Sequence, residues 1–284
     1  MQGRFRLIDS GAGDAAWNMA VDEALLLLCG EQPVFRFYSW DVPSLSIGSF
    51  QKVFALDLDG ISARGVPLVR RPTGGRAVLH DSELTYSITC CIPSDFFPSD
   101  LMGSYKKIGA CFLRGLNLAG IQAELVPVKK NCNINRLGGP LCFSSPSWHE
   151  VLAGGKKLIG SAQRRLKNSF LQQGSIIIDK DYDALLSLMK FEDESGREAA
   201  LDALSRKMTA LREHLPRIDI PELKSSIING FSDILNAEFL AGSLTLEEEA
   251  LARDLVEKKY SRPEWNMERR LTAPLKTPLP PSPF

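Results

Sequence analysis

The 284-residue chain lacks an excess of charge of either sign, because 34 lysines and arginines are matched by 34 aspartates and glutamates. No global field therefore attracts nucleic acid or an anionic membrane, and we expect neither as a partner. Long apolar runs are also missing. The longest, Ala24 to Cys29, falls far short of the ~20 residues that span a bilayer. The N-terminus has no apolar segment typical of a secretory signal, so we expect a cytoplasmic protein.

Metal and nucleotide motifs are also lacking. The sequence contains neither GxxxxGK[ST] nor GxGxxG, the usual phosphate-binding loops. Its six cysteines form no CxxC pair, so neither a disulfide framework nor a structural zinc site is expected. We therefore expect no metal and no cofactor, and mostly buried thiols with room for one reactive exception. The six are Cys29, Cys90, Cys91, Cys111, Cys132 and Cys142.

What is present is typical of a globular protein, with 44% hydrophobic and 24% charged residues. Alternating or apolar runs predict strands, and apolar residues at helical spacing predict helices. Because strands dominate the first part and helices the last third, the pattern favours an α+β fold with a mixed sheet of hairpins. The predicted strands are 34–40, 44–47, 66–71, 77–80, 84–92, 151–152, 157–163 and 174–179, and the predicted helices are 14–29, 104–119, 183–190, 197–211, 221–236 and 244–260.

The same pattern divides the chain into three parts. We expect a catalytic domain over 1–240 and a helical C-terminal extension over 241–270. The segment 271–284 is rich in proline and is expected to be a disordered tail. No heptad or long apolar edge stands out, so we expect a monomer.

The segment from Arg70 to Asp81 is the first candidate for chemistry. Two arginines end a strand, and Gly74 and Gly75 then allow the backbone to approach a ligand with no Cβ in the way. Such a loop can offer bare N–H groups to a carbonyl, carboxylate or phosphate. An ordinary turn between two strands would have the same composition, so the pattern alone leaves both interpretations open.

A second candidate is Cys142, which lies among glycine, serine and proline residues in a segment that reads as a loop. A thiolate is the reactive form, and a nearby cation such as Lys157 would lower the thiol pKa if the two segments were neighbours. The alternative is a small buried cysteine and a solvated lysine. Cys132 is a competing loop thiol. His80 or His149 could act as a base, but for His80 we favour hydrogen bonding that shapes a pocket.

Several blocks together resemble the biotin/lipoate A/B protein ligase superfamily. They are Trp17 to Leu25, Pro43 to Gly48, Arg70 to Asp81, Gly155 to Gln163 and Gln173 to Ile176. Within that superfamily, Cys142-Phe143-Ser144-Ser145-Pro146-Ser147-Trp148 is similar to the block that carries the acyl-thioester cysteine of the octanoyl-[acyl-carrier-protein]:protein N-octanoyltransferases.

The resemblance implies a biotin/lipoate-ligase-like fold and a ping-pong reaction. Cys142 would accept octanoyl from acyl carrier protein, and a lysine of a lipoyl-domain protein, such as glycine cleavage H protein, would then attack the thioester. Lys157 corresponds to the family's lysine beside the catalytic cysteine. By the same resemblance the acyl pocket is lined by Arg70, Thr73, Gly74, Gly75 and His80, with Gly160, Ser161 and Ala162 opposite.

Three other interpretations remain. An ATP-dependent lipoate–protein ligase would share the sheet and Lys157 but would not need Cys142. An amidotransferase would move octanoyl between lipoyl domains. A non-catalytic binder would hold a lipoyl-domain protein without turnover, although the presence of both Cys142 and Lys157 argues against it.

Overall fold

A mixed eight-stranded sheet forms the centre of the molecule in the computed structural model, which describes residues 3–126 and 150–271. The strand order is β11-β1-β2-β6-β10-β9-β8-β7. Strand β1 pairs in parallel with both β11 and β2, and the remaining neighbours are antiparallel. The strands are β1 (Gly3–Gly13), β2 (Val34–Trp40), β6 (Glu83–Cys91), β7 (Glu124–Val126), β8 (Glu150–Ala153), β9 (Lys156–Arg165), β10 (Ser169–Ile177) and β11 (Ala237–Gly242).

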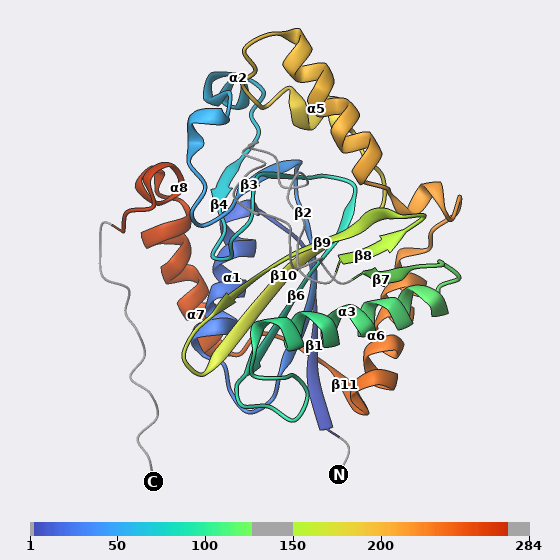
Figure 1. The fold of residues 1–284 in the computed structure, drawn as a ribbon. Helices are drawn as coiled ribbons and strands as arrows, with labels where there is room; N and C mark the ends of the chain where they lie inside the picture. The colour runs from blue at the N-terminus through green and yellow to red at the C-terminus, as the bar shows by residue number, and fades with distance from the viewer. Residues whose placement is uncertain (1–2, 127–149, 272–284) are drawn as a thin grey trace.

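Helices cover both faces of this sheet (Figure 1). Helices α3 (Leu101–Leu118) and α6 (Ile220–Leu235) pack on each other and on one face, whereas α1 (Ala15–Leu27) and α7 (Leu246–Leu255) lie on the other. Strand β2 shows how the sequence serves both layers. Phe35 and Phe37 join the α3/α6 core, and Val34 and Tyr38 join the α1/α7 core, because successive side chains of a strand point to opposite faces.

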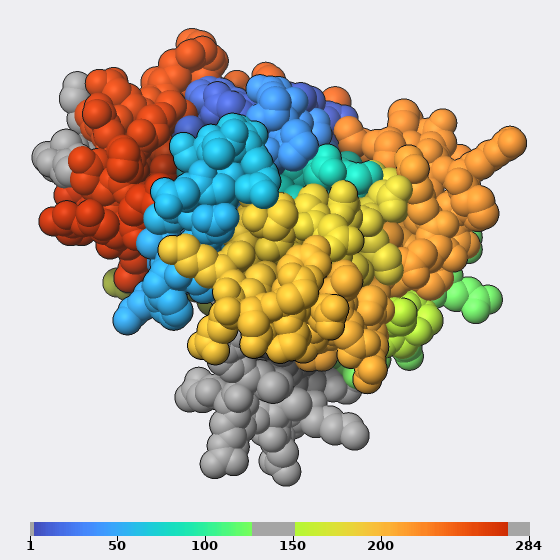
Figure 2. Space-filling model, turned by 90° about the horizontal axis from the view of Figure 1, so that it is seen from above, coloured from blue at the N-terminus to red at the C-terminus, as the bar shows by residue number. Residues whose placement is uncertain are grey.

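A second, three-stranded sheet lies beside the first, with the order β4-β3-β5 (Leu68–Arg70, Ser44–Ile47 and Val78–His80). Its outer side is covered by α2 (Leu58–Ala63), α4 (Tyr182–Leu186) and α5 (Glu194–Lys207), which form a third apolar core with it. Figure 2 shows α5 and the segment around α2 side by side on this face. The two sheets thus leave a junction between them.

The C-terminal helices return to the N-terminal part of the chain. After α7 comes one π-helical stretch, η4 (Val256–Tyr260), and then α8 (Pro263–Glu268), which contacts β4. Short 3-10 turns, η1 (Val53–Ala55) and η3 (Leu211–Glu213), complete the described elements. No helix within residues 3–126 and 150–271 is long and apolar enough to cross a membrane.

The expected α+β class with a mixed sheet is confirmed, and the predicted strands 34–40 and 44–47 have the same bounds in the structure. Three strands, β1, β7 and β11, were not predicted. β1 lies near the N-terminus and pairs with β11 of the last third of the chain, so that last third is not entirely helical. The expected boundary at residue 240 falls inside β11. Helix α6 ends at Leu235, one residue before the predicted end, and Asn236 caps it with a left-handed φ of 49°.

Candidate active site

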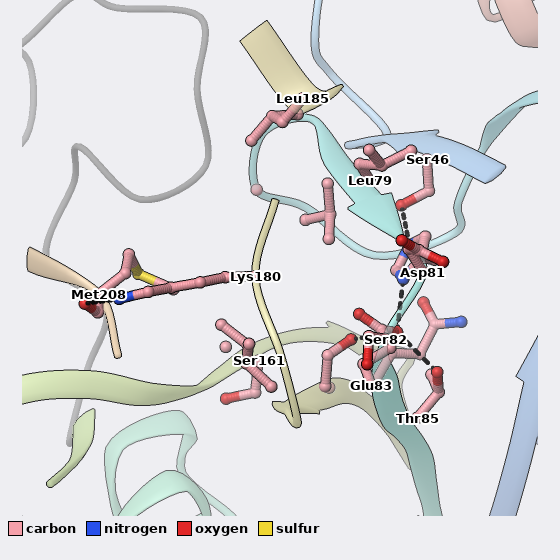
Figure 3. A pocket seen from close by; sticks show the side chains of 18 of the residues that line it. Ser46, Leu79, Asp81, Ser82, Glu83, Thr85, Ser161, Lys180, Leu185 and Met208 are labelled. Carbon is pink, nitrogen blue, oxygen red and sulfur yellow. Dashed lines mark hydrogen bonds and ion pairs between the residues drawn. The ribbon is translucent and has the colours of Figure 1, made fainter. Parts of the chain in front are cut away.

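A cavity of ≈ 120 Å³ lies at the junction of the two sheets. One wall comes from the segment that follows β4 together with β5, and the opposite wall comes from β9 and β10. Figure 3 shows Leu79 and Leu185 on one side of it and Glu83 and Thr85 on another. Apolar lining side chains include Val78, Leu79, Ile177, Leu185 and Met208. The site therefore combines an apolar lining with a small set of polar groups, as ligand pockets usually do.

The glycine-containing segment after β4 forms part of this wall. Gly75 lines the cavity with a φ of 95°, a conformation that side chains other than glycine rarely adopt. A Cβ on Gly48 would lie 1.9 Å from the Gly75 carbonyl oxygen, so both positions require glycine. Arg71 closes the turn, because its Nη2 donates to the carbonyl oxygens of Gly74 at 2.7 Å and Arg76 at 2.8 Å.

Thr73 ties this turn to the main sheet. Its hydroxyl donates to Gln173 Oε1 at 2.7 Å, and Gln173 Nε2 donates to Asp22 Oδ2 at 2.7 Å. Asp22 is fully buried and also accepts from Arg36 at 2.8 Å and from Tyr38 at 3.0 Å. Because buried polar groups are costly without partners, this continuous network holds the turn, β10 and α1 in one arrangement.

His80 lies at the cavity wall between two hydrogen-bond partners. Its Nδ1 is 2.7 Å from Glu83 Oε1, and its Nε2 is 2.6 Å from the Ser46 hydroxyl. Trp40 stacks on the imidazole, with ring centroids 4.1 Å apart. The arrangement fixes the orientation of the ring, and with it the positions of both nitrogen atoms.

Glu83 is the acidic residue among the side chains that hydrogen-bond around His80. Burial alone would raise the pKa of its carboxyl, but His80, together with hydrogen bonds from Thr85 and Ser175, holds that pKa below its ordinary value. The two hydroxyls lie 2.6 Å and 2.7 Å from Oε1. Glu83 is therefore an anion at neutral pH, buried against the ligand cavity.

The opposite wall contains Gly160, Ser161 and Ala162 of β9, all three of which line the cavity. They pair with Ser175, Gly174 and Gln173 of β10. A Cβ on Gly174 would lie 2.5 Å from the Tyr86 ring, so this glycine makes room for a buried aromatic side chain between sheet and helix.

Lys157 is the second residue of the same strand but is not among the residues that line the cavity. It is 6% exposed, and its carbonyl oxygen accepts from the backbone N–H of Thr209 at 3.0 Å. Cys142, its expected partner, lies outside the described residues, as do Cys132 and His149. The pairing of Cys142 with Lys157 therefore stays a prediction.

Arg70 also lies away from the cavity lining. Its guanidinium donates to the carbonyl oxygens of Gln51 at 2.6 Å, Trp265 at 3.0 Å and Met267 at 3.1 Å. In return, the Trp265 indole N–H donates to the Arg70 carbonyl oxygen at 2.9 Å. Arg70 thus joins β4 to α8. Thr73 and Gly74 are likewise adjacent to the lining residues rather than among them.

A buried cluster of charged side chains also attaches the C-terminal segment to the rest of the molecule. Glu23 of α1 accepts from Lys259 at 2.5 Å and from Tyr260 at 2.7 Å, and Arg164 of β9 reaches its other oxygen at 2.5 Å. Burial would raise the pKa of Glu23, but the charges of Lys259 and Arg164 bring it below the ordinary value. The segment after α7 is therefore built into the body of the molecule by charge pairs as well as by packing.

Several residues that line the cavity were not named as site residues from the sequence, among them Ser46, Glu83, Gln173, Lys180 and Met208. Glu83 had a local signal, because it follows His80 by three residues at the start of a strand, and Ser46 and Gln173 lie inside the blocks that carry the family resemblance. The others reach the cavity from separate elements. Within residues 3–126 and 150–271, no group of three or more His, Cys, Asp or Glu side chains could hold a metal ion.

With this geometry in view, known proteins show where the chain belongs. The model of the lipoyl protein ligase A/B catalytic domain matches residues 14–232. The chain belongs to this family. Within it, octanoyltransferase LipM of Brevibacillus brevis is 41% identical over 94% of the chain and 99% of its own length. The corresponding LipM of Bacillus subtilis is 36% identical over 93% of the chain and 98% of its own length. The expected octanoyltransferase branch of the lipoyl ligase family is confirmed.

Solved structures of the lipoyl ligase family have the same fold. A bipartite lipoate protein ligase from Thermoplasma acidophilum superposes with a TM-score of 0.79 at 27% identity, covering 93% of this chain and 96% of the other. A lipoate-protein ligase A bound with ATP gives a TM-score of 0.74 at 30% identity, covering 94% and 99%. The expected lipoate-ligase-like fold is therefore confirmed over nearly the whole chain.

Proposed function

We propose that this acyltransferase of the octanoyltransferase branch takes octanoyl from acyl carrier protein onto Cys142 and passes it to a lysine of a lipoyl-domain protein. The family membership carries the class of reaction, which is octanoyl transfer in protein lipoylation. Glycine cleavage H protein is the acceptor that the sequence resemblance suggests. The proposal places the reaction in the cytoplasm and assigns it to a monomer.

The observation that best supports an acyl substrate is the cavity itself. An alkyl chain is stabilised by leaving water for an apolar surface, at about 25 cal/mol per Å². Leu79, Ile177, Leu185 and Met208 offer such a surface at the junction of the sheets. The backbone of the segment around Gly75 and that of Ser161 and Ala162 flank it, and their N–H groups are candidate donors to an acyl oxyanion.

The proposed chemistry balances without a nucleotide. The Cys142 thiolate attacks the octanoyl carbonyl carbon, and the carrier protein leaves as a thiolate when its C–S bond breaks. The neutral acceptor amine then attacks the Cys142 thioester, forms the amide as it loses a proton to water, and releases the Cys142 thiolate. Exchange between thioesters is nearly isoenergetic and amide formation is downhill, so ATP is not required. In this proposal the Lys157 ammonium raises the thiolate fraction of Cys142 at neutral pH.

The remaining site residues hold the acyl group in the proposed reaction. His80, fixed by Glu83 and Ser46, shapes the wall beside the carbonyl end. Gly160, Ser161, Ala162 and Gly75 line the cavity. Three residues that do not line the cavity act on it indirectly, through the turn and its attachment to α8; they are Arg70, Thr73 and Gly74. We also propose the division into a catalytic part, a helical extension and a proline-rich tail.

An ATP-dependent lipoate–protein ligase is the second candidate, favoured by the similarity to the ligase bound with ATP. The two reactions differ in what they consume. Purified protein is incubated with octanoyl-acyl carrier protein and a lipoyl domain, with and without ATP, and the intact mass of each protein is followed. Transfer to the lipoyl domain without nucleotide is expected. A strict requirement for ATP and a free acid would replace the proposal with the ligase.

Two variants sharpen that experiment. Cys142→Ala should abolish transfer, whereas Cys132→Ala, which removes the competing loop thiol, should leave it intact. If the two variants exchanged these results, the nucleophile would be Cys132. A protein that used octanoyl-lipoyl domain as donor, and not octanoyl-acyl carrier protein, would be an amidotransferase instead.

A further inference from the structure

Two cysteines that play no part in the proposed transfer lie side by side at one end of the molecule. Cys29 lies just beyond the C-terminal end of α1, and Cys91 is the last residue of β6. Their sulfur atoms are 2.8 Å apart, and the Cys91 thiol is also 3.1 Å from the Cys29 carbonyl oxygen. The two sulfurs are therefore within about 1 Å of the ~2.05 Å bond length of a disulfide.

The surrounding backbone holds this pair together independently of the sulfurs. Cys91 pairs with Ser169 at the start of β10, and the Ser169 hydroxyl donates to the Leu26 carbonyl oxygen of α1 at 3.3 Å. The next residue, Ile92, donates its N–H to Asn168 at 2.8 Å. Because the end of the helix and the end of the strand are both anchored to the β9–β10 hairpin, the thiols cannot drift far apart.

Neighbouring thiols differ from this pair in access. Cys29 and Cys91 are partly exposed, whereas Cys90 and Cys111 are buried. Cys90 points to the opposite face of β6, as alternation along a strand requires, and burial raises its pKa to about 11. Burial raises the pKa of Cys111 to about 12, and burial together with the neighbouring Cys91 thiol raises the pKa of Cys29 as well, so access rather than acidity separates the pair from the buried thiols. An oxidant in solution can thus reach Cys29 and Cys91 more readily than the two buried thiols.

We propose that Cys29 and Cys91 form a dithiol–disulfide couple, a site of reversible two-electron oxidation. With hydrogen peroxide as oxidant, one thiol becomes a sulfenic acid as the O–O bond breaks and one water leaves. The second sulfur then attacks the sulfenic sulfur, the S–S bond forms and a second water leaves. A dithiol reductant reverses the reaction by thiol–disulfide exchange.

Oxidation of this couple stabilises the fold and leaves the cavity unchanged. The bond would close a loop between positions 29 and 91, and such a crosslink restricts the unfolded chain. Neither cysteine lines the cavity. The couple is therefore independent of the acyl-transfer reaction, and its test does not depend on that reaction.

The test is a peptide map of the folded, full-length protein after treatment with hydrogen peroxide and alkylation of the remaining thiols. We expect one crosslinked peptide joining Cys29 to Cys91, with Cys90 and Cys111 recovered as thiols. The unfolding midpoint should rise by on the order of 5 °C and return after treatment with dithiothreitol. Cys91→Ser should lose both the crosslink and the shift and keep the acyl-transfer rate, whereas Cys90→Ser should keep the crosslink.

Other products would overturn the proposal. They include Cys29 and Cys91 recovered as alkylated thiols or as sulfinic acids, a crosslink through Cys132 or Cys142 in their place, and a Cys29–Cys91 crosslink with no change in the midpoint. Repeating the map on Cys132→Ala shows whether a loop thiol competes. A Cys29–Cys91 crosslink that forms only in guanidinium chloride would also contradict the couple, because the folded geometry would then not be its cause.

Discussion

Glu83 Oε1 lies 2.7 Å from His80 Nδ1, at the wall of a cavity that two separate sheets enclose. A buried carboxylate in this position holds the imidazole in one orientation and also accepts from Thr85 and Ser175. The same oxygen thus organises groups from β5, β6 and β10 around the proposed acyl site.

Glu83→Gln should weaken this arrangement without changing its volume. The amide offers a neutral oxygen in place of the carboxylate, so the hydrogen bonds lose their charge assistance, worth on the order of 1–2 kcal/mol. We expect octanoyl transfer to fall about tenfold and the unfolding midpoint to fall by a few degrees. The comparison is Glu198→Gln, an exposed position on α5, which should change neither. Wild-type kinetics in Glu83→Gln would mean that the His80 orientation does not matter to transfer.

Thr73→Val tests the link between the glycine-containing turn and β10. The change keeps the shape of the side chain but leaves the buried Gln173 oxygen without the hydroxyl, at a cost of about 1–3 kcal/mol. The KM for the octanoyl donor should rise several-fold as the turn loosens.

A matched control for that substitution is Thr89→Val on β6. The Thr89 hydroxyl is buried and has no hydrogen-bond partner among residues 3–126 and 150–271, so its removal should be neutral or stabilising. Equal losses of stability in the two variants, measured by chemical denaturation, would refute the assigned role of the Thr73–Gln173 hydrogen bond.

Trp265→Phe tests whether α8 positions the proposed pocket. Phenylalanine keeps the aromatic contact with Lys259, whose ammonium is 4.0 Å from the ring centroid, but removes the indole N–H that satisfies the Arg70 carbonyl. We expect a loss of about 1–3 kcal/mol in the free energy of unfolding and a higher KM for the donor. Trp17→Phe on α1 is the control. A fall in stability with unchanged KM would limit α8 to a purely structural role.

Stability should depend on pH through the two buried carboxylates Glu23 and Glu83. Each has a folded-state pKa below the ordinary 4.5. The unfolded chain therefore binds more protons near that pH, and the stabilisation is present above it and lost as the pH falls through the folded pKa values. The unfolding midpoint should decline as the pH falls below about 4.5. This decline should be less steep in Glu83→Gln than in the wild-type protein. An unchanged slope in that variant would show that Glu83 is not linked to unfolding.

Local patterns were enough to predict most of the helices and strands. The alternation in β2 and the helical spacing in α1 and α3 follow from which faces are buried. Gly75, His80, Gly160, Ser161 and Ala162 were expected from the family resemblance, and all five line the cavity. Elements that are short, or that are stabilised by contacts with distant parts of the chain, were not predicted. β11 is stabilised by pairing with β1 at the other end of the chain, and α8 has only six residues.

The contacts of Arg70 show why the rest could not be predicted. Its sequence context, next to Arg71 and a glycine pair, suggests a substrate ligand. Its guanidinium instead meets carbonyl oxygens of residues nearly two hundred positions later, at the C-terminal end of the fold. Such contacts depend on the register and packing of distant elements, which no local spacing encodes. Ser46 and Met208 reach the cavity for the same reason.

The most direct test of the proposed reaction follows the acyl group on the enzyme itself. The protein is incubated with octanoyl-acyl carrier protein alone, without ATP or acceptor, and the isolated product is mapped by peptide mass spectrometry. One octanoyl group on Cys142 is expected, sensitive to hydroxylamine and delivered to a lipoyl domain added afterwards. An enzyme that carries no acyl group, or carries it on another residue, while still octanoylating the lipoyl domain would contradict the thioester mechanism.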